Sequence, residues 1–280
     1  MQYIELGDAR IPALGYGTWQ LEGDACTAGV HHALELGYRH IDTAQIYGNE
    51  AQVGAALAKT HVERKDIWLT TKVWTDRLSK GDLEKSVDES LTKLQTDYVD
   101  LLLIHWPSKD VFLSDTIDAL KHVMAEGKTR HIGVSNFPVK LMAEAQRLSG
   151  GKMITNQVEY HPFLDQTPVL DYVRNHNMFL TAYSPLARGR VNQDATLIDL
   201  GNKYGKTPAQ ITLRWLVQQP GVCAIPKAAN PEHIKTNMQI FDFSLTDAEM
   251  SEIGKLRGDL RLVNPAFAPV WDAAAAGCKV

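Results

Sequence analysis

Residues 99–105 of this chain read Val-Asp-Leu-Leu-Leu-Ile-His. The run is apolar almost throughout, which is typical of a strand covered on both faces in a parallel sheet, and it ends in a polar side chain. Three other strand-like runs also end in polar residues, at Asp42, Lys72 and Ser135. This repeated placement predicts one site that is assembled from the ends of consecutive strands.

Short strand-like runs alternate with longer segments of helical periodicity. After a hairpin over residues 3–6 and 9–12, strands are predicted at 13–17, 40–42, 67–72, 99–105, 130–135, 156–159, 179–183 and 222–226. The helices between them are predicted at 24–36, 50–59, 83–94, 115–125, 140–148, 169–176 and 208–218. Strands that alternate with helices imply right-handed crossovers and a parallel sheet. Eight such units favour a closed (β/α)8 TIM barrel of the α/β class.

The chain shows no linker or change of composition that would separate two domains. Residues 1–280 are therefore expected to form one barrel domain, a size that such barrels commonly reach. The segment 262–280 contains Pro265 and Pro269 and has no strong periodicity. It is expected to be a loop that covers the barrel mouth.

Composition and charge exclude several classes of function. The formal net charge is −4 and the pI is near 6.2, so no broad basic surface for nucleic acid or an anionic membrane is expected. The three cysteines lie far apart and lack metal-ligand spacing, which predicts neither a disulfide framework nor a zinc site. The N-terminus does not resemble a leader and no long apolar run occurs, so we expect a cytoplasmic protein. We also expect a monomer that acts on a small molecule and binds no metal.

Four of the candidate residues have complementary chemistry. A free tyrosine titrates near pH ~10, so Tyr47 needs help to act as a proton donor at neutral pH. An adjacent Lys72 ammonium is expected to lower the pKa of the phenol, and Asp42 to keep Lys72 charged. His105, between apolar neighbours, is expected to be neutral and to orient a carbonyl oxygen by hydrogen bonding. The residues alone leave open whether Tyr47 or His105 is the acid.

Each of these residues alone has a simpler interpretation, as a loop charge, a packing tyrosine or a core histidine. Their coincidence in sequential barrel units favours the functional interpretation. A carboxylate, a phenol, an ammonium and an imidazole at one rim could polarise a carbonyl and protonate it while a cofactor supplies hydride. The predicted reaction is carbonyl reduction.

Other motifs fail on inspection. Residues 15–17 read Gly-Tyr-Gly, but position 20 is Gln20, so the dinucleotide-binding fingerprint lacks its third glycine. Residues 201–207 resemble a phosphate-binding loop that is one residue short, and a helix end capped by glycine before a new helix is the better interpretation. The pair His31 and His32 has no third ligand at metal spacing.

The motifs 15–19 (Gly-Tyr-Gly-Thr-Trp), 37–50, 71–72, 97–107, 133–137 (Gly-Val-Ser-Asn-Phe), 156–160 and 225–227 occur in this order. In that order they resemble the aldo-keto reductase superfamily, and the resemblance runs from the hairpin to about Trp271. Within it, residues 43–47, 104–107, 261–265 and 268–272 are similar to prokaryotic 2,5-diketo-D-gluconic acid reductases, especially the B type.

The resemblance implies a barrel that binds NADPH extended across its C-terminal rim. Asp42, Tyr47, Lys72 and His105 match the catalytic tetrad of the superfamily. The residues that match cofactor contacts are Gly17, Thr18, Asp42, Ser135, Asn136, Gln157, Tyr183, Ser184, Pro185, Leu186, Lys227, His233 and Asn237. Among them, Ser135, Asn136 and Gln157 match the nicotinamide carboxamide contacts, and Tyr183 matches the stacking aromatic.

One departure concerns the 2′-phosphate of the cofactor. Members of the superfamily often have a serine after the lysine and an arginine downstream, where this chain has Ala228 and His233. The loss of these charge-assisted bonds predicts a weak preference, so NADH is expected to be accepted beside NADPH.

The substrate is the least determined part. Trp19, Trp74, Trp106 and Trp271 are expected to line the mouth with Tyr47 and His105, although loop packing explains any one tryptophan equally well. Small aldehydes, dicarbonyls such as methylglyoxal, and keto-sugar acids such as 2,5-diketo-D-gluconate are implied by the resemblance. Arg188 and Arg190 could meet cofactor phosphates or a substrate carboxylate, or be solvated charges. The alternative function is an NADPH-binding regulatory module with slow turnover, as in the potassium-channel β subunits of the same fold.

Overall fold

The computed structural model describes residues 1–273, and at its centre lies a parallel sheet of eight strands. Each strand pairs with the next one along the chain. A parallel bridge between Leu14 and Ala224, with Gly15 N donating to Ala224 O at 2.8 Å, joins the two edge strands and closes the sheet into the predicted barrel. The strands are β3 Tyr16–Gly17, β4 His40–Asp42, β5 Trp68–Val73, β6 Val99–Ile104, β7 Thr129–Ser135, β8 Met153–Glu159, β9 Phe179–Tyr183 and β10 Val222–Ala224.

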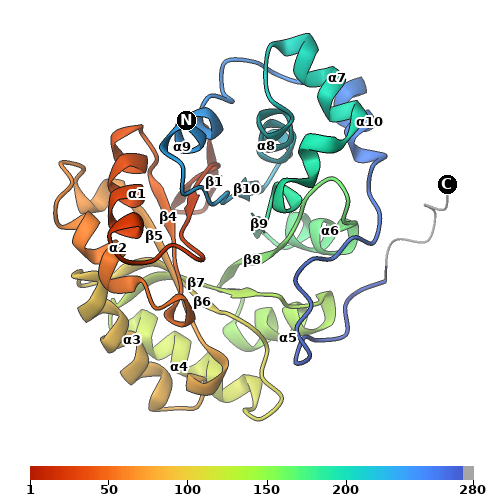
Figure 1. Ribbon diagram of the computed structural model, residues 1–280. Coiled ribbons are helices and arrows are strands. Elements are labelled where there is room, and N and C mark those ends of the chain that lie inside the picture. Colours follow the sequence, from red (N-terminus) through yellow and green to blue (C-terminus); the bar gives the residue numbers. More distant parts are fainter. Residues whose placement is uncertain (274–280) are drawn as a thin grey trace.

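Helices surround the sheet and fill the connections between its strands (Figure 1). The seven predicted helices are present, each with both ends within two residues of the prediction: α1 Gly23–Glu35, α2 Glu50–Leu57, α3 Asp82–Leu94, α4 Leu113–Ala125, α5 Val139–Ser149, α6 Thr167–Asn175 and α8 Pro208–Gln218. Short 3-10 turns lie at η1 Gln45–Tyr47, η2 Arg64–Asp66, η3 Thr75–Arg77 and η4 Ala187–Gln193.

Three helices were not predicted: α7 Ala195–Tyr204, α9 Pro231–Met238 and α10 Asp247–Gly254. Two of them are only eight residues long, too short for a clear apolar period. The usable signal lay in their N-caps, because Asp194, Asn230 and Thr246 each accept a backbone N–H of the first turn. The predicted glycine-capped helix end before α8 is confirmed, since Gly205 ends α7 in the left-handed conformation.

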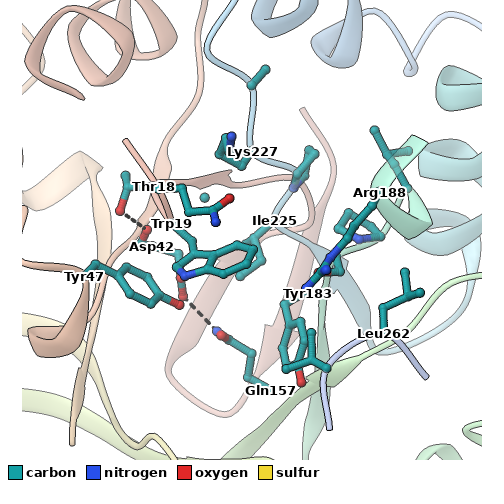
Figure 2. A pocket seen from close by; sticks show the side chains of 18 of the residues that line it. Thr18, Trp19, Asp42, Tyr47, Gln157, Tyr183, Arg188, Ile225, Lys227 and Leu262 are labelled. Atoms are coloured by element: carbon teal, nitrogen blue, oxygen red, sulfur yellow. Dashed lines mark hydrogen bonds between the residues drawn. The ribbon is translucent and has the colours of Figure 1, made fainter. Parts of the chain in front are cut away.

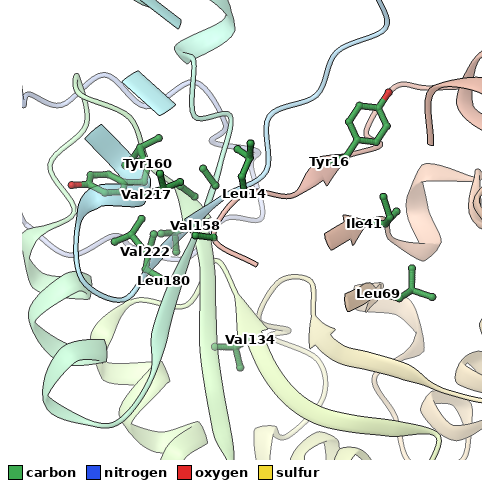
Figure 3. Packing of buried hydrophobic residues seen from close by; sticks show 14 of the residues in the cluster. Leu14, Tyr16, Ile41, Leu69, Val134, Val158, Tyr160, Leu180, Val217 and Val222 are labelled. Carbon is green, nitrogen blue, oxygen red and sulfur yellow. The ribbon is translucent and has the colours of Figure 1, made fainter. Parts of the chain in front are cut away.

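Alternate residues of each strand face opposite sides of the barrel wall. In β6, Leu102 and Ile104 belong to the large apolar cluster between sheet and helices, whereas Leu101 and Leu103 belong to a smaller cluster inside the barrel. Figure 3 shows part of the outer cluster, with Ile41 and Val134 among the strand residues labelled.

The N-terminal hairpin closes one end of the barrel. Strands β1 Tyr3–Leu6 and β2 Ala9–Pro12 pair antiparallel, as predicted. Ala9 and Ile11 of the hairpin pack inside with Trp68 and Phe179, which are the first residues of β5 and β9. The hairpin therefore covers the N-terminal ends of the strands, and the C-terminal ends remain for a site.

Strand alternation places Lys72 and His105, two of the predicted catalytic residues, inside the barrel at that open end. Lys72 has the same parity in β5 as Trp68, which packs inside, and Tyr183 has the same parity in β9 as Phe179. His105 continues the inward series of Leu101 and Leu103 just beyond β6. The pleat of the strands thus points side chains from distant parts of the sequence at one another.

After α10 the chain returns across the barrel mouth (Figure 1). We call residues 261–272 the strap; Leu262, Val263 and Phe267 within it line a cavity at the mouth. The predicted covering loop is therefore present, and its part beyond residue 273 lies outside the described residues. Among the helices of residues 1–273, none has the length and apolar character needed to cross a membrane.

A buried histidine makes the fold sensitive to acid. His40 is 1% exposed, and its ring nitrogens lie 3.4 Å from Pro12 O and from Thr70 Oγ1. Burial lowers the pKa of His40 from 6.5 to about 4. Between these two pH values, His40 is protonated in the unfolded chain but neutral in the folded chain. The free energy of unfolding therefore falls as the pH drops.

We expect this residue to remove about 3 kcal/mol from the free energy of unfolding between pH 7 and pH 4. His40→Gln cannot titrate and should lose that part of the pH dependence, whatever its stability at pH 7. Urea unfolding of both proteins at several pH values in this range measures the difference. Equal slopes of stability against pH in the two proteins would contradict the assignment.

Candidate active site

A cavity of about 1080 Å³ opens at the C-terminal ends of the strands. Tyr47 and His105 line one part of it, and Lys227 and His233, from the segments after β10, line another. Figure 2 shows Tyr47, Gln157 and Tyr183 around the floor of the cavity, with Lys227 beyond Trp19. The space is large enough for a ligand bigger than a drug-sized molecule.

A buried ion pair lies beneath the cavity. Lys72 is fully buried, and its Nζ donates to Asp42 Oδ1 at 2.6 Å, to Thr43 O at 2.8 Å and to the Tyr47 hydroxyl at 3.4 Å. Gln157 reaches across the barrel and donates from Nε2 to the other oxygen of Asp42 at 2.8 Å (Figure 2). Burial lowers the pKa of Lys72, and the Asp42 carboxylate opposes that shift.

Tyr47 does not have the lowered pKa expected from the sequence. Burial of the phenol, together with the Asp42 carboxylate, holds the pKa of Tyr47 well above 10. The positive charge of Lys72 is already matched by Asp42 at 2.6 Å, whereas the phenol oxygen is 3.4 Å from Nζ. Tyr47 therefore keeps its proton in the free protein, and Lys72 can favour the phenolate only once that proton has left.

His105 is neutral, as expected. Burial, with a smaller effect from the Lys72 charge, lowers the pKa of His105 well below 6.5. The edges of Tyr47 and Trp74 pack against its ring, with centroids 5.6 and 5.1 Å away. Its Nδ1 is buried and finds no partner among residues 1–273, so Nε2 is the nitrogen available to the cavity. The neutral imidazole of His105 thus provides one hydrogen-bond donor next to the Tyr47 hydroxyl.

The turn that carries Tyr47 is fixed by two amide side chains that the sequence prediction missed. Gln45 Nε2 donates to Ser86 Oγ and Ser90 Oγ of α3, both at 3.1 Å, and its Oε1 accepts Trp74 N. Asn49 Nδ2 donates to Thr18 O at 2.8 Å. Both amides lie within two residues of Tyr47, and the presence of two amide side chains beside the candidate tyrosine was the available signal.

A chain of hydrogen bonds runs from β9 back to the tetrad. Tyr183 donates its hydroxyl to Asn136 Oδ1 at 2.7 Å, and Asn136 Nδ2 donates to Ser135 Oγ and to His105 O, both at 3.0 Å. Asn136 has φ 64°, a left-handed conformation that Asn tolerates. Ser135 Oγ donates to Gln157 O at 2.8 Å. Asn136, Gln157 and Tyr183 line the cavity, and Ser135 lies behind them.

The remaining predicted cofactor contacts also come together. At Gly17 a Cβ would lie 2.7 Å from Ile225 O, so bare backbone is required there. Arg188 reaches the cavity with its guanidinium 5.7 Å from the Trp19 ring centre, whereas Arg190 is not among the lining residues. The predicted contacts that line the cavity beside those named above are Thr18, Asp42, Ser184, Pro185, Leu186, Lys227, His233 and Asn237.

These groups fit an extended dinucleotide. A nicotinamide would fit beside the tetrad, where the side-chain amides of Asn136 and Gln157 could bind its carboxamide and the Tyr183 ring could stack on it. No residue in the described part of the chain donates to Gln157 Oε1, which leaves an acceptor for a carboxamide. Arg188 and Lys227 supply cations for phosphates further along the same cavity.

The other wall of the cavity is aromatic. Trp19, Trp74 and Trp106 line it as predicted, and Phe267 of the strap lies across it, with its ring centre 5.9 Å from Trp74 and 5.5 Å from Trp106. Trp271 is outside the lining and packs on the far side of Trp106, at 5.9 Å. Nothing in the local sequence distinguishes Phe267 from other exposed loop residues, since only the course of the strap brings it here.

Comparison with known proteins matches this geometry. The model of the Aldo/keto reductase family matches residues 13–257. This chain belongs to that family. The aldo-keto reductase predicted from the motifs is confirmed, and the protein is an oxidoreductase that reduces carbonyl groups with a nicotinamide cofactor.

Individual aldo-keto reductases are similar over nearly their whole length. Methylglyoxal reductase DkgB of Escherichia coli O157:H7 is 42% identical over 94% of this chain and 99% of its own. Glyoxal reductase of Bacillus subtilis (strain 168) is 40% identical over 90% and 91%. A crystal structure named as a candidate 2,5-diketo-D-gluconic acid reductase B superposes with a TM-score of 0.95 at 50% identity and covers 98% of both chains. The predicted similarity to the B-type reductases is confirmed.

Proposed function

We propose that this protein reduces small carbonyl compounds with NADPH and that Tyr47 is the general acid. One observation carries the proposal: the Tyr47 hydroxyl shares a cavity with the amides of Asn136 and Gln157 and lies 3.4 Å from the Lys72 ammonium. A carbonyl held at Tyr47 is thus beside the place where a nicotinamide fits.

The raised pKa of Tyr47 is compatible with this role. Reduced nicotinamide, when bound, would supply a hydride to the carbonyl carbon and become oxidised, and the carbonyl oxygen would then develop the charge of an alkoxide. An alkoxide is a stronger base than a phenolate, so Tyr47 gives up its proton to it although its pKa is high. The phenolate that remains is stabilised by Lys72, which donates to the same oxygen. The stabilisation therefore strengthens as the reaction proceeds.

His105 orients the substrate. Its neutral ring can donate from Nε2 to the carbonyl oxygen, and because its pKa is well below 6.5 it is not an imidazolium near neutral pH. The one proton that the neutral ring keeps is much less acidic than that of a phenol. This leaves Tyr47 as the better acid of the two that the sequence left open. Trp74 packs against the imidazole and limits its rotation.

The charge of the walls favours neutral substrates. Within residues 1–273, the Lys and Arg side chains lining the cavity are Lys227, on the cofactor side, and Arg188, whose guanidinium lies 5.7 Å from the Trp19 ring centre. Trp74, Trp106 and Phe267, which form the wall next to His105, carry no charge to pair with a carboxylate. A carboxylate there would lose solvation without a partner. We therefore propose neutral aldehydes and dicarbonyls such as methylglyoxal, the substrate named for DkgB, ahead of keto-sugar acids such as 2,5-diketo-D-gluconate.

We further propose that residues 1–280 act as one barrel domain, a monomer in the cytoplasm. The tetrad and the proposed cofactor contacts all come from this chain, so the proposed reaction requires no residue from a second copy. The sparse, widely spaced cysteines of the sequence support a reducing compartment.

Tyr47→Phe should lower kcat for methylglyoxal at least ~100-fold, because it removes the proton donor and little else. Binding of NADPH, followed by fluorescence, should remain. Tyr98→Phe is the matched control, since that hydroxyl is outside the cavity. Near-normal turnover of Tyr47→Phe would move the acid role elsewhere. A wild-type protein that binds NADPH but reduces no carbonyl would support a regulatory module instead.

Benzaldehyde should be reduced with a kcat/KM at least ~10-fold above that of 4-carboxybenzaldehyde, because the carboxylate finds no cation in the aromatic wall. The methyl ester of the latter has the same shape without the charge and should behave like benzaldehyde. Steady-state consumption of NADPH measures all three. Equal use of the carboxylate would restore the keto-sugar acids as the leading class.

NADPH should exceed NADH in kcat/KM by about 10- to 150-fold, which is what one charged contact from Lys227 supplies. Lys227→Met should bring the ratio close to one, while Lys235→Met, on the exposed face of α9, should leave it unchanged. A wild-type ratio above about a thousand is more than one such contact provides and would show that other residues recognise the 2′-phosphate.

A further inference from the structure

The strap contributes one wall of the cavity. Leu262, Val263 and Phe267 line the cavity from this segment, together with Asn264 and Pro265. The position of this wall therefore depends on the side chains that bind the two ends of the strap.

Glu159 holds the first end. It is the last residue of β8, faces inward two residues beyond Gln157, and is 0% exposed. Its Oε1 accepts Leu262 N at 2.8 Å and lies 3.0 Å from His161 Nε2, while Oε2 accepts Val263 N at 2.8 Å. Burial alone would raise the pKa of Glu159, but these bonds outweigh it and the pKa is lowered. A charged carboxylate is thus satisfied largely by the backbone of the strap.

The second end and the interior of the strap are also fixed. Asp272 accepts Val139 N, the first residue of α5, at 3.0 and 3.3 Å. Trp271 Nε1 donates to Asn264 Oδ1 at 2.9 Å, and the Arg261 guanidinium lies 3.8 Å from the Trp271 ring centre. Because the strap is internally bonded, a shift at Glu159 is passed on to Phe267.

We propose that Glu159 is a positioning residue for the carbonyl substrate, which it affects only through the strap. By holding the amides of Leu262 and Val263 it places Phe267 against Trp74, which in turn packs on His105. The inference rests on the proposed function, because it assigns the aromatic wall to the substrate.

The charge of Glu159 matters more than its shape. A glutamine of the same size has one acceptor oxygen and one amide group that can only donate. Both strap amides are donors, so one of them would face another donor in Glu159→Gln. The start of the strap should come loose while the rest of β8 keeps its place.

Glu159→Gln should raise KM for 4-nitrobenzaldehyde, whose ring needs the aromatic wall, at least tenfold. The KM for methylglyoxal should rise less, because that molecule is too small to depend on Phe267. The kcat for both and the dissociation constant of NADPH should stay within about threefold. Glu159 bonds to neither Tyr47 nor the phosphate side, and its neighbour in β9, Tyr183, is held in place by its own bond to Asn136. A general loss of structure would move all these quantities together.

Three further measurements complete the test. Glu144→Gln removes an exposed carboxylate of α5 and should change nothing. Hydrogen exchange at the amides of Leu262 and Val263 should accelerate in Glu159→Gln. Asp272→Ala removes the acceptor of Val139 N without altering a buried residue, and should raise the KM for 4-nitrobenzaldehyde about threefold; it decides the question if Glu159→Gln does not fold.

An unchanged KM for 4-nitrobenzaldehyde in Glu159→Gln, or an equal loss of NADPH affinity, would overturn the positioning role. If Glu159→Gln does not fold, an unchanged KM in Asp272→Ala would do the same. A wild-type protein without carbonyl reduction would instead refute the proposed function, and the exchange experiment would still report whether Glu159 anchors the strap. The two failures are therefore distinguishable.

Discussion

A single ion pair, between Lys72 Nζ and Asp42 Oδ1, organises the open end of this barrel. Burying the charge of a lysine that is 0% exposed costs folding free energy unless the charge is paired. The positions of Asp42 and Thr43 O, which accept from Lys72 Nζ, are therefore fixed by this requirement. The second oxygen of Asp42 also accepts a hydrogen bond, which Gln157 donates from across the barrel. Through Gln157 the pair is connected to Ser135, Asn136 and Tyr183, so the amides proposed to hold the cofactor and the residues proposed for catalysis form one network.

The same pair explains why the phenol of Tyr47 keeps its proton at rest. Burial disfavours the phenolate most, and Asp42 adds to this by neutralising the Lys72 charge that would otherwise favour it. An enzyme gains nothing from an acid that is ionised before the substrate arrives. Under the proposed mechanism, Lys72 acts on the charge that appears at the phenol oxygen during reduction, which is where stabilisation accelerates a reaction.

Much of this arrangement could be predicted from the sequence, because it follows from local rules. Apolar runs gave the eight strands, and the polar residue at the end of each run gave Asp42, Lys72 and His105 as a set. The pKa of Tyr47 could not be predicted, because its sign depends on distances of 2.6 and 3.4 Å that no spacing encodes. Phe267 and Glu159 were missed for a related reason: one is an ordinary loop residue, and the other acts through backbone amides more than a hundred positions away.

The two-residue period of the strands limits how such a chain can change in length. Lys72 faces the barrel interior because an even number of positions separates it from Trp68. Loss of one residue between them would turn the lysine towards the helices and bring an apolar neighbour inward. Outside the turn that carries Tyr47, insertions and deletions in the connections are therefore compatible with the tetrad. Within a strand, a single-codon deletion acts on every inward side chain that follows.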